Sequence, residues 1–147
     1  MAIRRKTSEE AGMAAVREVR ALFASFEDSS AAPAEPVPAE PVTSEVAQAF
    51  AALPRSVRAT FVRFTLEELA TLAPGNSVEV RVPPLGVTQC VAGPRHTRGT
   101  PPSVVETSPV VWAALALGEC SWEQAVAAGV LDASGERSDL STLLPLF

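Results

Sequence analysis

The chain has 147 residues, of which 47% are hydrophobic, and its 12 basic and 17 acidic residues give a formal net charge of -5. This length accommodates one hydrophobic core but hardly two, and the acidic balance disfavours general binding to nucleic acid or to anionic membranes. No long apolar run spans a bilayer, and polar residues follow Arg4–Lys6 where a signal peptide needs an apolar segment, so we expect a cytoplasmic protein without stable membrane insertion.

The first predicted element is an amphipathic helix within residues 1–28. Thr7 and Glu10 have the spacing of a capping box at its start. The apolar residues that follow fall on one helical face: Val16, Val19, Leu22, Phe23 and Phe26. Such a face must cover a surface. That surface is either the chain's own domain, which is slightly favoured, or a partner protein.

Residues 29–43 separate this helix from the rest of the chain. The pentapeptide Pro-Ala-Glu-Pro-Val occurs twice in succession, at Pro33–Val37 and Pro38–Val42. Proline at these intervals removes backbone donors and favours an extended conformation, so the segment is predicted to be a semi-rigid spacer. The chain is therefore expected to comprise an N-terminal helix (1–28), a Pro/Ala/Glu-rich linker (29–43) and a domain (44–147). We expect a chain that begins near Thr43 to stay folded.

Two helices and two strands are predicted after the linker. Residues 44–53 and 56–72 carry apolar side chains at helical spacing, and the Pro-Gly-Asn of residues 74–76 ends the second helix. In Val78–Val82, valines alternate with charged residues, which is the pattern of a strand with one solvent-exposed face. Leu85–Val91 is expected to form the next strand.

The following segment has local start and stop signals. Val104–Thr107 reads as a strand, and Ser108 is suited to cap the helix that follows it. Pro109 is tolerated at the first position of that helix, where no N–H is needed, and Gly118 can end it.

A short helix and a last strand complete the expected domain. Ser121 and Gln124 have the spacing of a capping box, and Gly129 is suited to end the helix. Val130–Ser134 returns as a strand, and the apolar C-terminal residues are expected to form a terminal helix. Helices gathered on one side of a small, largely antiparallel sheet of about five strands make an α+β fold.

From about Arg55 to the C-terminus, this order of elements resembles the SCP-2-like sterol-carrier domains, and more closely the actinobacterial group of bacterial sterol-carrier orthologues. The resemblance implies a cavity between sheet and helices that the C-terminal helix closes. On this sequence, the residues on or near that cavity would be Trp112, Leu115, Val126, Leu140, Leu143, Leu144 and Phe147. Ordinary core packing explains apolar residues at these positions equally well, because a cavity differs from a core only by unfilled volume.

The loop Gly93–Pro102 is a second candidate site. It contains Arg95, His96, Thr97 and Arg98, and no carboxylate lies between Cys90 and Ser103. Guanidinium groups bind phosphate or carboxylate in bidentate fashion, so the loop is suited to hold an anionic head group. The alternative is structural: both arginines pair with nearby carboxylates, such as Glu106, Asp132 or Glu136.

Patterns that indicate catalysis are weak in this sequence. Cys90 and Cys120 are too few for a disulfide framework or a zinc site, and a Cys90–His96 pair lacks an orienting acid at a recognisable spacing. Glu106 and Asp132 are placed to form a carboxylate pair across adjacent strands, although nothing in their spacing requires it. We therefore expect that the protein is not an enzyme and binds no cofactor.

The resemblance implies a non-enzymatic domain that binds an apolar or lipid-like small molecule. The alternative is a protein-interaction or accessory module on the same scaffold, with a partner bound through the N-terminal helix. Sterol-carrier-like folds also occur attached to mycothiol-dependent enzymes, so a link to thiol-dependent chemistry is part of that alternative.

Overall fold

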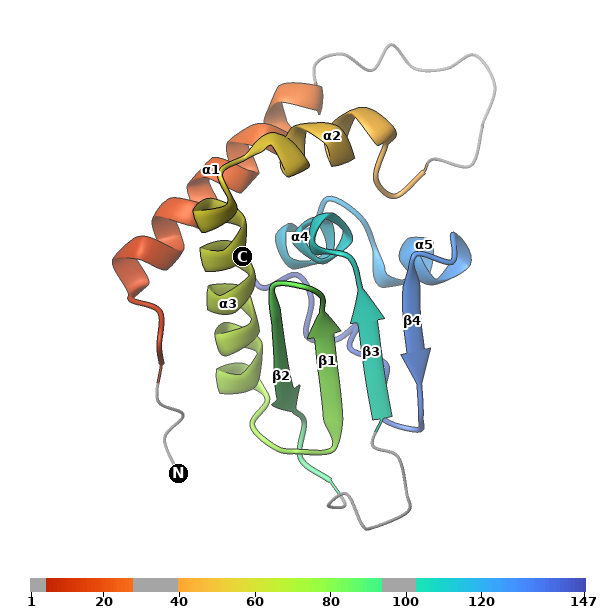
Figure 1. Cartoon of the computed structure of the whole chain (residues 1–147). Helices are drawn as coiled ribbons and strands as arrows, with labels where there is room; N and C mark the ends of the chain where they lie inside the picture. Colours follow the sequence, from red (N-terminus) through yellow and green to blue (C-terminus); the bar gives the residue numbers. More distant parts are fainter. Residues whose placement is uncertain (1–4, 28–39, 94–102) are drawn as a thin grey trace.

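The computed structural model describes residues 5–27, 40–93 and 103–147, and the statements below concern these residues. They form an α+β fold with five helices and four strands (Figure 1). The helices are α1 (Glu9–Glu27), α2 (Ser44–Ala52), α3 (Arg55–Leu72), α4 (Pro109–Leu117) and α5 (Trp122–Ala127). The strands are β1 (Val78–Val82), β2 (Gly86–Cys90), β3 (Ser103–Thr107) and β4 (Leu131–Ser134).

The sheet is mixed, with the strand order β2-β1-β3-β4. The β1–β2 and β3–β4 pairs are antiparallel, whereas β1 and β3 run parallel. The predicted α+β class and the largely antiparallel pairing are confirmed. The expected number of about five strands is one too high for the described residues, because the chain after β4 forms turns and adds no strand.

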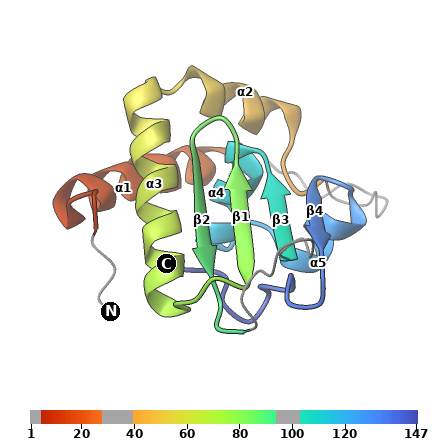
Figure 2. The same cartoon turned by 60° about the horizontal axis from the view of Figure 1, so that its bottom comes forward.

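The two faces of the sheet differ, as the alternation in β1 predicts. Val78, Val80 and Val82 are fully buried, while Glu79 and Arg81 lie on the opposite face. In Figure 2, α4 lies behind the sheet and no described helix covers the face turned toward the viewer. The hydrophobic core therefore lies between one face of the sheet and the helices.

Helix α1 packs on the chain's own domain, against α3 and α2 (Figure 1). Its buried residues Ala15, Val16, Val19 and Phe23 belong to the main hydrophobic cluster. Removal of α1 would expose the surface beneath these side chains, which argues against the expectation that a chain beginning near Thr43 stays folded. The three-part division itself stays a prediction, because residues 28–39 of the linker lie outside the described residues.

The cap of α1 differs from the predicted one. The helix begins at Glu9, and the Ser8 hydroxyl accepts a hydrogen bond from the Ala11 N–H at 3.2 Å. Thr7 lies one residue further out, and its N–H donates to Glu67 of α3 at 3.2 Å. A tertiary contact thus holds Thr7, and Ser8 takes the capping position.

The expected terminal helix is absent from residues 135–147. A turn follows Leu140, whose carbonyl accepts the Leu143 N–H at 2.9 Å. Pro145 has no N–H to donate and disfavours helical geometry at Leu144. The chain instead runs back to α4, where the Leu146 N–H donates to the Ala116 carbonyl at 2.9 Å.

Candidate ligand-binding site

Helix α4 is the centre of the apolar layer between sheet and helices. Its start follows the predicted signals: the Ser108 hydroxyl accepts the Val111 N–H at 3.4 Å, and Pro109 occupies the first turn. Gly118 ends it with a φ of 76°, a left-handed conformation that glycine adopts without strain. Every residue from Val111 to Leu117 is buried. A helix that is apolar on all sides must be covered on all sides.

Trp112 projects from α4 toward α3 and is fully buried. Its indole Nε1–H donates to the Thr65 Oγ1 at 2.8 Å, and the Thr65 hydroxyl donates to the Phe61 carbonyl at 2.8 Å. Both polar side chains are therefore satisfied inside the core, which removes the cost of burying them. This hydrogen-bonded chain fixes the indole in one orientation.

The other predicted cavity residues occupy three environments. Leu115 and Leu140 are almost completely buried and belong to the same hydrophobic cluster as Trp112. Leu143 is half-buried against that cluster. Val126 is 47% exposed and so lies outside this buried core. The structure thus places Trp112, Leu115 and Leu140 in one hydrophobic core, with Leu143 packed against it.

A tail of four residues, Leu144–Phe147, covers the end of α4. Leu144, Leu146 and Phe147 pack half-buried against the core. The Phe147 ring stacks on Phe64 of α3, with centroids 5.8 Å apart and an interplanar angle of 20°. The tail therefore covers the core in the place where a terminal helix was expected. Its backbone is held on α4 by two hydrogen bonds, which the Leu146 and Phe147 N–H groups donate to the Ala116 carbonyl.

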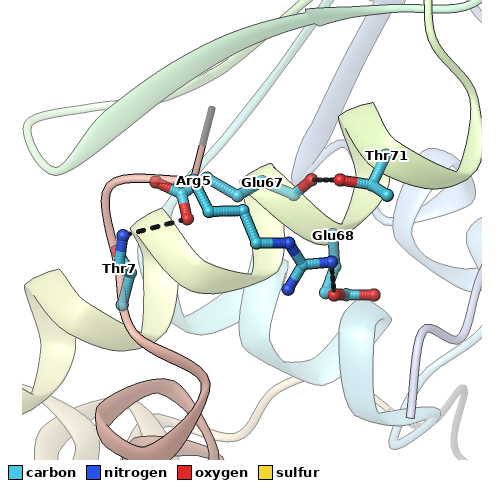
Figure 3. A network of polar contacts seen from close by, with 5 residues as sticks. All are labelled: Arg5, Thr7, Glu67, Glu68 and Thr71. Atoms are coloured by element: carbon cyan, nitrogen blue, oxygen red, sulfur yellow. Dashed lines mark hydrogen bonds and ion pairs between the residues drawn. The ribbon is translucent and has the colours of Figure 1, made fainter. Parts of the chain in front are cut away.

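A hollow of about 410 Å³ lies elsewhere, between α3, strand β2 and the segment that precedes α1. It is lined by Lys6, Thr7, Arg63, Leu66, Glu67, Leu85, Gly86, Val87 and Thr88. Figure 3 shows how the leading segment is held on α3: Thr7 is joined to Glu67, and Arg5 forms an ion pair with Glu68. Sequence reasoning missed this hollow because its walls are 60 positions apart along the chain.

The outer face of the sheet carries Glu106 and Asp132, the two carboxylates that the sequence places on adjacent strands. Glu106 of β3 lies directly opposite Asp132 of β4, and Arg81 of β1 bonds to Glu79 at 2.8 Å. Like charges directly opposite each other destabilise a strand pair. Among the described residues, no group of three His, Cys, Asp or Glu side chains is arranged to hold a metal ion.

The predicted anion site at Arg95, His96, Thr97 and Arg98 lies outside the described residues, so it stays a prediction. A further arginine joins the two ends of that segment. The Arg137 guanidinium donates to the Ala92 carbonyl at 3.4 Å, and the Arg137 backbone N–H donates to the Ser103 hydroxyl at 3.2 Å.

Both cysteines are buried free thiols. Burial raises the pKa of Cys90 to about 11, and burial together with the Glu119 charge raises the pKa of Cys120 to about 11. A thiol with this pKa is protonated at neutral pH and is a poor nucleophile. This chemistry weighs against thiol catalysis at Cys90.

The raised thiol pKa values predict a loss of stability at alkaline pH. A thiol that titrates at about 11 when folded and at about 8.5 when unfolded stabilises the fold fully below the lower value, and this contribution is lost as pH rises through the higher one. Thermal midpoints measured from pH 8 to 11 should therefore fall less steeply in Cys90→Ala than in the wild type. Parallel slopes would contradict this assignment.

The character of the helices and two comparisons with known proteins bear on the identity of the chain. None of the helices formed by the described residues has the length and apolar character needed to cross a membrane. A family model described as bacterial SCP ortholog matches residues 54–146, and no match is found among curated proteins. The matched part contains α3, α4, α5, the sheet and most of the tail, whereas α1, α2 and the segment before α1 precede it.

Proposed function

The chain belongs to the family of bacterial SCP orthologs, and on this premise we propose that it is a non-enzymatic sterol-carrier-like domain that binds an apolar or lipid-like small molecule between its sheet and its helices. The observation that supports the proposal is the combination of α4, apolar on every side, with the tail Leu144–Phe147 that covers one end of it. Ligand sites for small molecules are predominantly apolar, with few polar groups.

The tail is the element that an apolar ligand would displace. Trp112, Leu115 and Leu140 are fully buried, whereas the tail side chains are half-buried. The tail has no helical hydrogen bonds of its own to lose, and the ring contact of Phe147 with Phe64 can be replaced by an acyl chain or a sterol ring. Burial of a comparable apolar area by the ligand then offsets the exposure of the tail.

Deletion of Leu144–Phe147 should strengthen ligand binding while it lowers the stability of the unliganded protein. Binding of monomeric oleate is followed by Trp112 emission in a Trp122→Phe background, so that only one indole reports. Without the tail, we expect the affinity for oleate to rise about tenfold or more. This factor corresponds to ~1.4 kcal/mol, the free energy that the ligand no longer spends on displacing the tail.

A matched control is Leu72→Ala, which removes an exposed apolar side chain from the end of α3, 58% exposed. This variant should bind oleate as the wild type does. A tail deletion that lowers the thermal midpoint without any oleate response, together with a clean apo mass in native mass spectrometry, would identify a filled core and refute the proposal.

A further inference from the structure

The hollow beside α3 is built from an apolar floor and a charged rim. Leu66 and Leu85 form the floor and are buried, 3% and 6% exposed. Gly86 keeps the strand close to the helix, because a Cβ there would stand 3.0 Å from the Leu66 Cδ1 and 3.2 Å from the Val62 Cγ1. Val87 lies at the edge of the hollow and is 59% exposed.

The charges at the rim are not balanced. Lys6 and Arg63 both line the hollow, and within the described ranges no carboxylate lies at ion-pair distance from either side chain. Glu67 is the acidic residue of the lining, and its two oxygens accept the backbone N–H groups of Lys6 and Thr7 at 3.1 and 3.2 Å. The lining therefore carries two cationic side chains and one carboxylate, and the carboxylate oxygens accept from the backbone N–H groups of the segment that precedes α1 rather than from a cation.

We propose that this hollow binds an amphipathic anion, with its apolar body on Leu66, Leu85 and Val87 and its carboxylate or phosphate head between Lys6 and Arg63. The volume of about 410 Å³ lies within the range of small-molecule sites. The hydroxyl groups of Thr7 and Thr88 also line the hollow and can donate to the head group. The inference does not rest on the proposed core site, because no tail residue lines this hollow.

The site depends on the docking of the N-terminal segment. Arg63, Glu67 and strand β2 lie within the part of the chain matched by the family model, whereas Lys6 and Thr7 precede it. An anion held between Lys6 and Arg63 would therefore link the segment that precedes α1 to helix α3. Bound ligand should stabilise this docked arrangement through its preference for the docked state.

Isothermal titration of the full chain with monomeric laurate and with dodecyl phosphate tests the proposal. Both should bind saturably and shift the amide signals of Gly86 and Thr88. Lys6→Gln and Arg63→Gln should each weaken binding about fivefold or more, whereas Arg20→Gln, an equal charge change on the exposed side of α1, should leave the affinity unchanged. Val87→Asp should also weaken binding, because it places a negative charge where the apolar body of the ligand would lie.

Two further ligands separate the contributions of the anionic head group and the apolar chain to binding. Dodecanol, which lacks the charge, and inorganic phosphate, which lacks the chain, should each bind at least about tenfold more weakly than dodecyl phosphate. Deletion of Leu144–Phe147 should not alter this binding, so failure here and failure of the proposed core site are distinguishable. Equal weakening by Arg63→Gln and Arg20→Gln, or tight binding of dodecanol, would overturn the inference.

Discussion

Leucine in place of Gly12 is expected to separate helix α1 from helix α3 and to lower the free energy of unfolding by about 3 kcal/mol or more. Gly12 is buried at the contact between the two helices, and a Cβ there would overlap the Phe64 ring. Phe64 has no room to withdraw, because it is 1% exposed and stacks on Phe147. Relief of the clash therefore requires α1 to move, which exposes the fully buried Val16 and Val19.

Urea denaturation measures this loss, and two variants sharpen the test. Ala14→Leu places the same side chain on the exposed side of α1 and should change stability little. In a Phe64→Ala background, the cost of Gly12→Leu should shrink, because the two positions are in contact and their effects are not additive. If Gly12→Leu costs no more than Ala14→Leu, helix α1 is not held by this contact.

Local signals in the sequence were sufficient where a cap or a turn is decided by neighbouring residues. Ser108, Pro109 and Gly118 define α4, and Ser121 with Gln124 forms the predicted capping box, with bonds of 3.1 and 2.9 Å. In these cases the donor and acceptor lie within four positions of each other. No distant contact competes for them, so the prediction and the structure agree.

Distant contacts decided the points that the sequence could not predict. Thr7 fits a capping box, but Glu67 of α3 accepts its N–H, and the cap passes to Ser8. The hollow at Lys6 and Arg63 exists only once α1 has docked on α3. Lys6 belongs to the basic run Arg4–Lys6, and no local signal in the sequence predicts that Lys6 lines a hollow.

The C-terminus illustrates how composition alone misleads. Its apolar residues were expected to form a helix, yet Pro145 interrupts helical hydrogen bonding and the tail bonds to the Ala116 carbonyl. The apolar character was nevertheless informative, since these residues do cover the core. Hydrophobicity predicted burial here, whereas backbone chemistry determined the conformation.

Replacement of Trp112 by alanine is expected to cost about 3–5 kcal/mol, the range for truncation of a buried aromatic residue. Trp112 is fully buried within the main hydrophobic cluster. Trp112→Phe retains most of the volume but leaves the Thr65 hydroxyl without the indole donor, so a smaller loss of about 1–2 kcal/mol is expected. Thr65→Val should cost a similar amount, and the double variant should cost less than the sum of the two.

The same variant tests whether Trp112 stands beside unfilled volume. If the indole completes a filled core, Trp112→Ala creates an apolar cavity that stays dry and takes up indole, so indole should raise the thermal midpoint of the variant and leave that of the wild type unchanged. If a cavity already borders Trp112, indole should stabilise the wild type as well, and the truncation should cost less than about 3 kcal/mol because the residual cavity is partly present beforehand. The wild-type response to indole therefore distinguishes a ligand site that is open at rest from one that forms only when the tail Leu144–Phe147 is displaced.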